Sequence, residues 1–443
     1  MRRLEKALAS GRLGCCLLGM LLPVPAGAQT NAAAVPVATN LTVSDAEAIA
    51  LKNHPRVTTA RLLALAQGQV TREVRSAELP TVTGSLTAVQ AHDGGRVTAG
   101  FLNNPVLYTR AAGGVTVSQL ITDFGRTQNL VASAGLREKA QQSDAMATEQ
   151  DIRLAVDAAF YRALAAQAVV NVAKKTVAFR QDNADLIGSL ASAKLKSTLD
   201  QSFADVNLNQ AKLLLLDAQN EQDASFADLS TVMGYERQQS IVLVDDAKGE
   251  LAAPAQDVDS LTALAMRSRP DLAALDDQFQ ATERFRKAEH DLWRPTISAL
   301  GTAGGAPVRA DEITSSWYGA AGVNISVPVF NGGLNSARAK EADYRADAAR
   351  EQARELRNRI ARDVRVSWLS AQSAYERMSV TAKLLAQANQ ALDLAQTRYK
   401  LGLSSIVELS QAELAQTSAE IGNTNARYDY QQSLAAIRYQ TGQ

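Results

Sequence analysis

Two acidic side chains at matching places are the clearest candidates for chemistry in this 443-residue chain. Asp200 and Glu408 lie 208 positions apart, and each follows a serine, Ser197 or Ser405, by three residues. A serine can cap the start of a helix, and an acid in the first turn is favoured by the helix dipole. One interpretation is therefore purely structural. Any further role depends on which elements bring these carboxylates together.

Other residues that could support catalysis or bind a metal are few. His54, His92 and His290 are far apart in the sequence and do not have the spacing of a metal site or a nucleophile system. The glycine pairs at 94–95 and 304–305 lack the sequence context of a phosphate-binding loop. The sequence therefore does not indicate an enzyme, and we expect no cofactor.

The N-terminus has the features of a secretory signal. Basic residues come before an apolar stretch at 13–22, which is too short to span a bilayer, and Ala26-Gly27-Ala28 resembles a cleavage site. We therefore expect residues 1–28 to be a signal peptide. Cys15 and Cys16 both lie inside it, so the mature chain would contain no cysteine and form no disulfide.

The charge balance argues against one class of partner. The chain has 46 basic and 46 acidic residues, and loss of residues 1–28 would leave a net charge near −3. Nucleic-acid-binding proteins normally show a basic face, so we expect no nucleic-acid partner. No later stretch has the length and apolar character of a transmembrane helix, so any insertion into a membrane would have to use strands.

The sequence consists of two similar halves. Later in each half the offset between equivalent residues is 208, but nearer the start of each half it is 215. The difference of seven residues falls in a region of predicted strands, where a loop can absorb it. The offset of 215 relates Pro55 and Pro80 to Pro270 and Pro295. We expect a first structural repeat at residues 29–258 and a second at 259–443.

Long helices with coiled-coil spacing occupy most of each half. Small and apolar residues recur at alternating intervals of three and four over 156–177 and over 364–399. Frequent alanine at these positions would let helix axes approach closely. No proline interrupts 106–253, so we predict one continuous helix over about 124–190, with a break beginning near Gly188. Periodicity alone is equally compatible with an ordinary antiparallel helical pair in a soluble bundle.

Each half also contains a predicted strand hairpin, at about 81–121 and at about 296–329. Apolar residues alternate with polar or small ones, as over 323–329, and the loops at 92–107 and 304–316 have the composition of exposed segments. Four strands are too few to close a barrel, so in lipid their edges would need partners. The pattern favours a membrane barrel shared among subunits. The alternative is a soluble periplasmic coiled-coil adaptor or scaffold without a pore.

The joins between strands and helices carry local signals. In Asp123-Phe124-Gly125 and Asn331-Gly332-Gly333, a short acceptor side chain at an expected N-cap is followed by glycine, which permits a tight change of direction. At the other joins we expect a proline to end the incoming helix. The expected junction residues are Pro80, Asp123, Gly125, Pro295, Asn331 and Gly333.

In the order and duplicate spacing of these motifs, the sequence resembles the outer-membrane efflux protein family, the TolC-like channel tunnels. The paired prolines, the two strand-to-helix junctions and the segment Tyr399 to Leu409 carry the resemblance. It implies a mainly α-helical fold with a membrane β-barrel, in which a homotrimer shares twelve strands, four from each protomer, in outer-membrane lipid. The helices would form a coiled-coil tunnel in the periplasm. The implied function is the passive exit duct of a tripartite efflux or type I secretion system.

The resemblance also implies roles at the turns between the long and the return helices. Family members carry acidic rings at the narrow periplasmic end of the tunnel, and the matching positions here are Glu408 and Asp200. Because Gln411 and Ser404 replace an aspartate and an arginine of some members, we expect one acidic constriction and a closed state with fewer ionic ties. A periplasmic adaptor, linked to an inner-membrane pump of the RND or ABC type, is expected to contact Ser192, Lys194, Ser197, Gly402, Ser404 and Ser405. Equally, these residues could serve only to build the turns.

Overall fold

The computed structural model describes residues 39–90, 109–239, 241–245, 251–254, 257–309 and 314–443. The expected signal peptide and the predicted loop at 92–107, which includes His92, lie outside these described residues. The described residues are mostly helical and form one compact unit.

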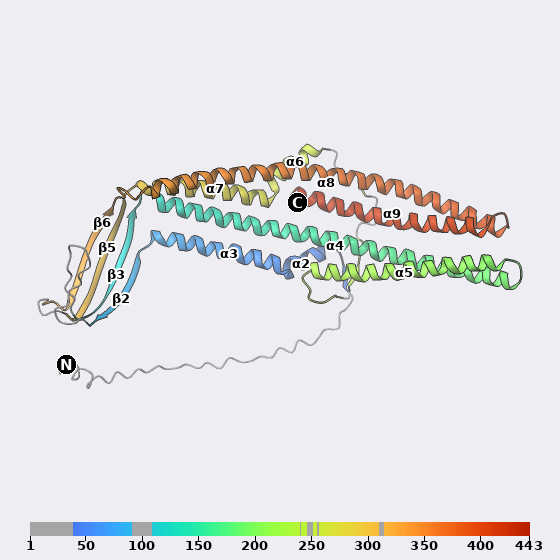
Figure 1. The fold of residues 1–443 in the computed structure, drawn as a ribbon, viewed down its shortest axis with the longest axis horizontal. Helices are drawn as coiled ribbons and strands as arrows, with labels where there is room; N and C mark the ends of the chain where they lie inside the picture. The colour runs from blue at the N-terminus through green and yellow to red at the C-terminus, as the bar shows by residue number, and fades with distance from the viewer. Residues whose placement is uncertain (1–38, 91–108, 240, 246–250, 255–256, 310–313) are drawn as a thin grey trace, which may run out of the picture. The chain divides into compact units, whose positions relative to one another are not determined.

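Apart from two short strands of the first half, the two halves form the same elements in the same order (Figure 1). Both long helices have 67 residues and both return helices have 35, which accounts for the constant offset of 208 in the sequence. The first half contains α2 (Val43–Asn53), α3 (Pro55–Arg75), the 3-10 helix η1 (Ser76–Glu78), β2 (Thr81–Val89), β3 (Arg110–Thr122), α4 (Arg126–Ser192) and α5 (Thr198–Val232). The second contains α6 (Val258–Ser268), α7 (Pro270–His290), η2 (Asp291–Trp293), β5 (Thr296–Val308), β6 (Trp317–Ser326), α8 (Leu334–Lys400) and α9 (Ile406–Gln440).

The first long helix extends further than predicted. Gly188 does not break it, because α4 continues to Ser192 and the turn occupies residues 193–197. A helical glycine costs only about 1 kcal/mol relative to alanine, which the packing of a long helix can offset. The predicted seam is confirmed in α4: Val156, Ala163 and Val170 are among its buried residues.

The prolines lie beside helix boundaries in two different ways. Pro55 and Pro270 take the first position of α3 and α7, where a backbone N–H is not needed. The prediction that Pro80 and Pro295 end the incoming helices is wrong in detail, because η1 and η2 lie between those helices and the prolines. Each of these two prolines instead directly precedes a strand, β2 or β5.

Two hydrophobic clusters occupy equivalent places in the two halves. In the first half, α2 and α3 bury side chains against α4, and in the second half α6 and α7 bury the equivalent side chains against α8. The equivalent sets are Ala50, Val57, Ile152 and Val156 in the first half, and Ala265, Leu272, Ile360 and Val364 in the second. Burying one Val, Leu or Ile side chain contributes roughly 1.5–3 kcal/mol, so each cluster fixes the kinked short helices against a long one.

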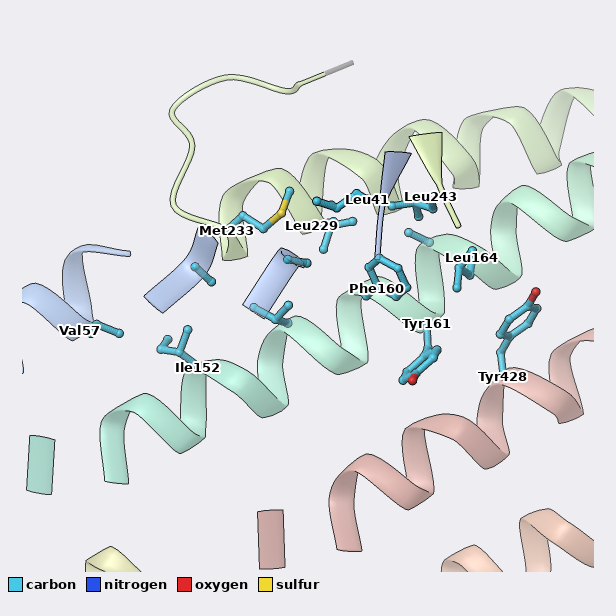
Figure 2. Close-up of a cluster of buried hydrophobic side chains, with 14 residues drawn as sticks. Leu41, Val57, Ile152, Phe160, Tyr161, Leu164, Leu229, Met233, Leu243 and Tyr428 are labelled. Carbon is cyan, nitrogen blue, oxygen red and sulfur yellow. The ribbon is translucent and has the colours of Figure 1, made fainter. Parts of the chain in front are cut away.

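The first cluster is larger because it also contains side chains of α5, of α9 and of a small parallel sheet (Figure 2). Strand β1 (Thr39–Leu41) pairs with β4 (Ile241–Leu243), and Leu41 and Leu243 are both buried beside Phe160. The segment 235–259, for which the sequence predicts no structure, therefore contains β4 and the start of α6 among its described residues.

Candidate functional site

The four longer strands form one open antiparallel sheet. Its order is β2-β3-β5-β6, so the two predicted hairpins lie side by side and are joined by pairing between β3 and β5. The helices next to the sheet follow the same order, with α3 against α4, α4 against α7 and α7 against α8 (Figure 1). Within the described residues, the edge strands β2 and β6 each have one neighbour only. Two open edges are available for pairing with other chains.

The two faces of this sheet differ in chemistry. Successive side chains alternate between faces, so the pairing register assigns each residue to one of them. One face is mainly polar or small, with Val89, Leu120, Leu300 and Tyr318 as exceptions, and carries Thr81, Thr83, Ser85, Thr87, Thr116, Ser118, Ser298, Thr302, Asn324 and Ser326. The other face is mainly apolar, and carries Val82, Leu86, Val115, Val117, Ile297, Trp317, Val323 and Ile325.

The apolar face is open to its surroundings in the single chain. Leu86 is 93% exposed, and Val82 and Val323 are each 64% exposed. An exposed aromatic side chain, Trp317, lies on this face at the start of β6. An exposed apolar band with an aromatic residue at its rim is typical of a barrel that faces lipid. No helix among the described residues is long and apolar enough to cross a membrane.

The strand-to-helix junctions depend on glycine with left-handed backbone. Gly125 (φ 102°) and Gly333 (φ 86°) are the N-cap residues of α4 and α8. Asp123 is not the N-cap that the sequence predicts, but its Oδ2 still accepts from the Thr127 backbone N–H at 2.7 Å. The prediction for Asn331 is not confirmed, because its Oδ1 is buried without a hydrogen-bond partner in the described part of the chain.

Arg294 links the junction after β3 to the junction before β5. Its Nη1 donates to the backbone carbonyl oxygen of Phe124 at 2.7 Å, and its Nε lies 3.0 Å from Asp291 Oδ1. Phe124 has φ 58°, which is uncommon for a residue other than glycine, and its N–H donates to Thr122 Oγ1 at 3.1 Å. The turn after β3 is therefore held by the residue that precedes Pro295 and β5.

The turns of the two helical hairpins, α4–α5 and α8–α9, have the same construction. We call residues 190–200 and 398–408 the hairpin tips. After the long helix, Lys194 (φ 60°) and Gly402 (φ 72°) adopt left-handed backbone. The N–H of the next residue, Leu195 or Leu403, donates to a carbonyl five residues earlier at 2.8 Å. This Schellman arrangement satisfies the last carbonyls of each long helix.

Asp200 and Glu408 both lie in the first turn of a return helix, but their carboxylates have different partners. The Asp200 carboxylate accepts from the backbone N–H of Ser197 at 3.2 Å, and Ser197 Oγ accepts from the Asp200 N–H at 3.1 Å. The Glu408 N–H donates to Ser405 Oγ at 3.4 Å, whereas its carboxylate lies 3.5 Å from Arg398 Nη1. Asp200 is therefore engaged in a capping box, while Glu408 forms a half-exposed ion pair within its own hairpin.

A cation–π contact joins the two tips. Lys196 Nζ lies 3.9 Å from the centroid of the Tyr399 ring. The ring is buried among apolar side chains of both hairpins, including Ile187 and Leu409. Burial, and then the nearby charge of Asp200, raise the pKa of Tyr399. The sequence patterns did not reveal this contact, because the position of Tyr399 in the helical seam predicts burial but not its partner.

A second set of polar residues, here called the inter-hairpin cluster, lies between α4, α5 and α9. Asn183 Nδ2 donates to Glu413 Oε1 at 2.8 Å, Asn207 Nδ2 donates to Ser410 Oγ at 2.7 Å, and Arg180 Nη1 donates to the Asn207 carbonyl oxygen at 2.9 Å. Burial raises the pKa of Glu413 and lowers that of Arg180, because it disfavours both charged forms. These residues were not predicted from the sequence.

The residues expected to contact an adaptor lie at the tips. Ser197 and Ser405 are helix N-caps, and the Ser192 hydroxyl donates to the Gly188 carbonyl oxygen at 2.9 Å. Ser404 is half-buried, and its hydroxyl has no hydrogen-bond partner in the described part of the chain. The exposed members of the set are Ser192, Lys194, Ser197, Gly402 and Ser405.

The histidines that the structure describes serve local contacts. His54 Nδ1 accepts from the Arg56 N–H at 3.1 Å at the start of α3, and His290 Nε2 lies 3.0 Å from Asp343 Oδ1. Among the described residues, no group of three or more His, Cys, Asp and Glu side chains could hold a metal ion.

A duplicated helical hairpin joined to a sheet with one apolar face and two open edges defines an outer-membrane channel protein. Comparison with known proteins gives the family. Residues 48–235 and 261–443 match the family described as outer membrane efflux protein, and the chain belongs to that family. It is therefore a passive channel of the outer membrane and not an enzyme, and the alternative of a soluble periplasmic scaffold is not supported. Proteins of this family work with other components of efflux or secretion systems.

Individual relatives are distant in sequence but cover most of the chain. The outer membrane efflux protein BepC of Brucella suis is 22% identical over 411 residues, which is 90% of this chain and 85% of the relative. The outer membrane protein TolC of Escherichia coli is 23% identical over 333 residues, 71% of this chain and 66% of the relative. The solved structure of the outer-membrane channel OprN shares the fold, with a TM-score of 0.77 at 20% identity over 90% of this chain and 89% of that chain.

Proposed function

We propose that three copies of this chain close into one twelve-stranded barrel, which three pairs of helical hairpins continue as a tunnel through the periplasm. The observation that carries this proposal is the sheet with its exposed apolar face and its two open edges, β2 and β6. In lipid every strand edge must be paired, so β6 of one copy would pair with β2 of the next. The polar face would then line the lumen.

The outer helices support the same arrangement. Near the sheet, α3 and α8 are the outer members of the helical layer, and near the tips α5 and α8 are. These helices carry large apolar side chains that are exposed in the single chain, and a neighbouring copy would cover them. They include Leu62 and Leu65 on α3, Leu213 and Leu216 on α5, and Val366, Leu369, Val380, Leu384 and Leu394 on α8.

The oligomeric state and the conductance test this proposal together. We expect the detergent-solubilised protein to have the mass of three mature chains by light scattering, and to form ion channels in planar bilayers. A monomer that osmotic shock releases from cells and that forms no channels would contradict the proposal.

We further propose that Glu408 forms the acidic constriction at the periplasmic end, with a smaller contribution from Asp200. The Glu408 carboxylate is half-exposed, whereas the Asp200 carboxylate is engaged by the N-terminus of its own helix. Three carboxylates around a narrow pore would raise the local cation concentration. Arg398, 3.5 Å from Glu408, would partly neutralise that charge.

Reversal potentials in asymmetric salt test the constriction. We expect Glu408→Gln to lower cation selectivity and divalent block, Arg398→Gln to raise cation selectivity, and Asp200→Asn to have the smallest effect of the three. If Glu408→Gln leaves cation selectivity and divalent block unchanged, the proposed acidic constriction is wrong, and the Glu408 carboxylate only stabilises the start of α9.

The tips are the proposed contact with a periplasmic adaptor, which links the channel to an inner-membrane pump of the RND or ABC type. The proposed contact residues are Ser192, Lys194, Ser197, Gly402, Ser404 and Ser405. A photo-crosslinking residue at 192 or 194 avoids the two N-cap serines, Ser197 and Ser405, and position 345 on the exposed face of α8 is a matched control. Adaptor crosslinks from the tips but not from 345 are expected. The reverse pattern would place the contact elsewhere.

A further inference from the structure

A tyrosine at the start of β6 lies across its neighbouring strands. Tyr318 pairs with Gly304 on β5, and Gly304 pairs with Gly114 on β3. A Cβ added at Gly114 would lie 3.1 Å from the ring carbon that bears the hydroxyl, and closer still to the hydroxyl oxygen. A Cβ added at Gly304 would overlap the same end of the side chain. The side chain therefore lies flat over two strands, in space that only glycine leaves free.

The register places this tyrosine on the polar face of the sheet. Along β3 and β5, the next pair on that face is Thr116 with Thr302, whose hydroxyl oxygens lie 3.4 Å apart. Trp317, the residue before Tyr318, is on the apolar face. In the proposed barrel, Tyr318 would therefore face the lumen and Trp317 the lipid.

The first half of the chain lacks this arrangement. The residue equivalent to Tyr318 at the offset of 208 is Arg110, which pairs with Val89 on the neighbouring strand. Valine there leaves no gap in the wall, so a side chain could not lie across the strand in the same way. Within the described sheet, a tyrosine lies over two glycines in this way only on β6, and the recess combines Gly304 of the second half with Gly114 of the first.

We propose that Gly114 and Gly304 form a recess in the lumen wall that holds Tyr318 flat, and that this seating keeps the part of the barrel near the hairpin loops open. The inference rests on the proposed trimeric barrel, in which three such rings would lie at one level. A tyrosine that stood perpendicular to the sheet would reach roughly 6 Å into the lumen. Laid flat, the three rings form part of the wall along which a substrate passes.

Single-channel conductance with a double-mutant cycle tests this seating. Gly114→Ala removes the recess at its tightest point and should push the ring into the lumen, lowering conductance by roughly 20–50%. In the Tyr318→Ala background the same change should have no further effect, because there is no ring to displace. Gly322→Ala is the matched control: it adds a methyl group to the same face, where nothing lies within 4 Å of the added carbon.

Two results would overturn the inference. One is a loss of conductance from Gly114→Ala that persists in the Tyr318→Ala background, because the loss would then not involve the ring. The other concerns the conductance of Tyr318→Ala alone. If the ring lies flat, this conductance should change little. A rise in conductance of roughly half or more would mean that the ring already projects into the lumen. The Cβ added in Gly114→Ala would also lie 2.9 Å from the Ala303 carbonyl oxygen, so that variant could fail to assemble. The conductance of Tyr318→Ala still tests the inference in that case.

The inference can fail without the proposed function failing. If the unaltered protein forms trimeric channels but the variants do not follow the pattern above, the seating is wrong and the barrel stands. If the unaltered protein forms no channel, the proposed barrel itself is wrong. Conservative replacement gives a further check: Tyr318→Phe keeps the ring and should preserve the effect of Gly114→Ala, because the end of the ring would still meet the added carbon.

Discussion

Lys194 and Gly402 take the same place at the tips of the two hairpins, and both have left-handed backbone, with φ of 60° and 72°. A residue with a Cβ pays roughly 1–2 kcal/mol for this conformation, whereas glycine adopts it freely. We expect Lys194→Gly to stabilise the folded protein by about 0.5–1 kcal/mol, because the greater freedom of glycine in the unfolded chain offsets part of the gain. The midpoint of thermal unfolding should rise.

Two matched variants make this test specific. Lys175→Gly introduces the same replacement inside α4, where it should lower stability by about 1 kcal/mol. Gly402→Lys should destabilise the second tip. If Lys194→Gly lowered the midpoint as much as Lys175→Gly does, the strain attributed to Lys194 would be absent.

Gly234 and Gly442 pack against equivalent bends between short helices. Their φ angles are 84° and 73°, and a Cβ on either would lie 2.8 Å from the carbonyl carbon of Asn53 or Ser268. Because the obstacle is backbone, we expect Gly234→Ala to destabilise the first half by roughly 2–4 kcal/mol. Denaturant titration of the purified protein measures the change.

Gly188→Ala is the control for that substitution. Gly188 lies within α4, and the nearest atom to an added Cβ is 3.9 Å away, so alanine should stabilise the helix by about 0.5–1 kcal/mol. Equal tolerance of alanine at 188 and 234 would contradict the packing described for Gly234.

We expect Asp157 to make the stability of the protein depend on pH below neutrality. Burial, and then the neighbouring Glu47, raise the pKa of Asp157 to about 7, although Arg438 and Arg153 act in the opposite direction. The folded chain therefore keeps a proton on Asp157 that the unfolded chain releases above the ordinary aspartate pKa of 3.8. The contribution of Asp157 to the free energy of unfolding therefore falls as the pH rises from 3.8 toward 7. We expect Asp157→Asn to flatten the dependence of the unfolding midpoint between pH 5 and 8.

The exposed Asp393 supplies the control for the pH experiment. Asp393→Asn removes an acidic group of the same type from a solvent-facing position of α8, so the pH dependence should stay as in the unaltered protein. A full pH dependence in Asp157→Asn would show that other groups cause it.

The inter-hairpin cluster should hold α9 against α4. Asn183→Ala removes the donor 2.8 Å from Glu413 Oε1 and leaves a buried carboxyl oxygen without that partner, at a cost of about 1–3 kcal/mol. Hydrogen exchange should therefore become faster in the first turns of α9. Gln372→Ala, which removes an exposed contact to Glu376 within α8, is the control, and equal exchange in both variants would contradict the role of Asn183.

The elements of this fold follow closely from local sequence patterns. The spacing of three and four over 364–399 predicts α8 because one face of a helix repeats at that interval, and alternation over 323–326 predicts the end of β6 in the same way. Strands β1 and β4 were not predicted, since three residues are too few to show a period. The N-cap of α4 was predicted at Asp123, two residues before its actual position at Gly125. The cause is the left-handed backbone of Phe124 and Gly125, which the sequence pattern does not show.

The contacts within the candidate site were harder to predict. Lys196 meets Tyr399, and Asn183 meets Glu413, across more than 200 residues of sequence. Each of these side chains is of a type common in helix turns or in the buried stripe of a helix, so its sequence position does not indicate a partner. The partner is determined by how the two helical hairpins pack against each other. Asp200 and Glu408 show the reverse case: the sequence makes them equivalent, but their local hydrogen bonds and ion pairs distinguish them.

The central claim is that the polar face of the sheet lines a water-filled lumen and the apolar face meets lipid. Single-cysteine variants along β6 test it in one labelling measurement on intact outer membranes, because both natural cysteines lie in the expected signal peptide. A membrane-impermeant thiol reagent should label cysteine at Ala320 and Asn324, and should not label it at Ala321 and Val323. Equal labelling at all four positions, or labelling of the second pair alone, would contradict the account.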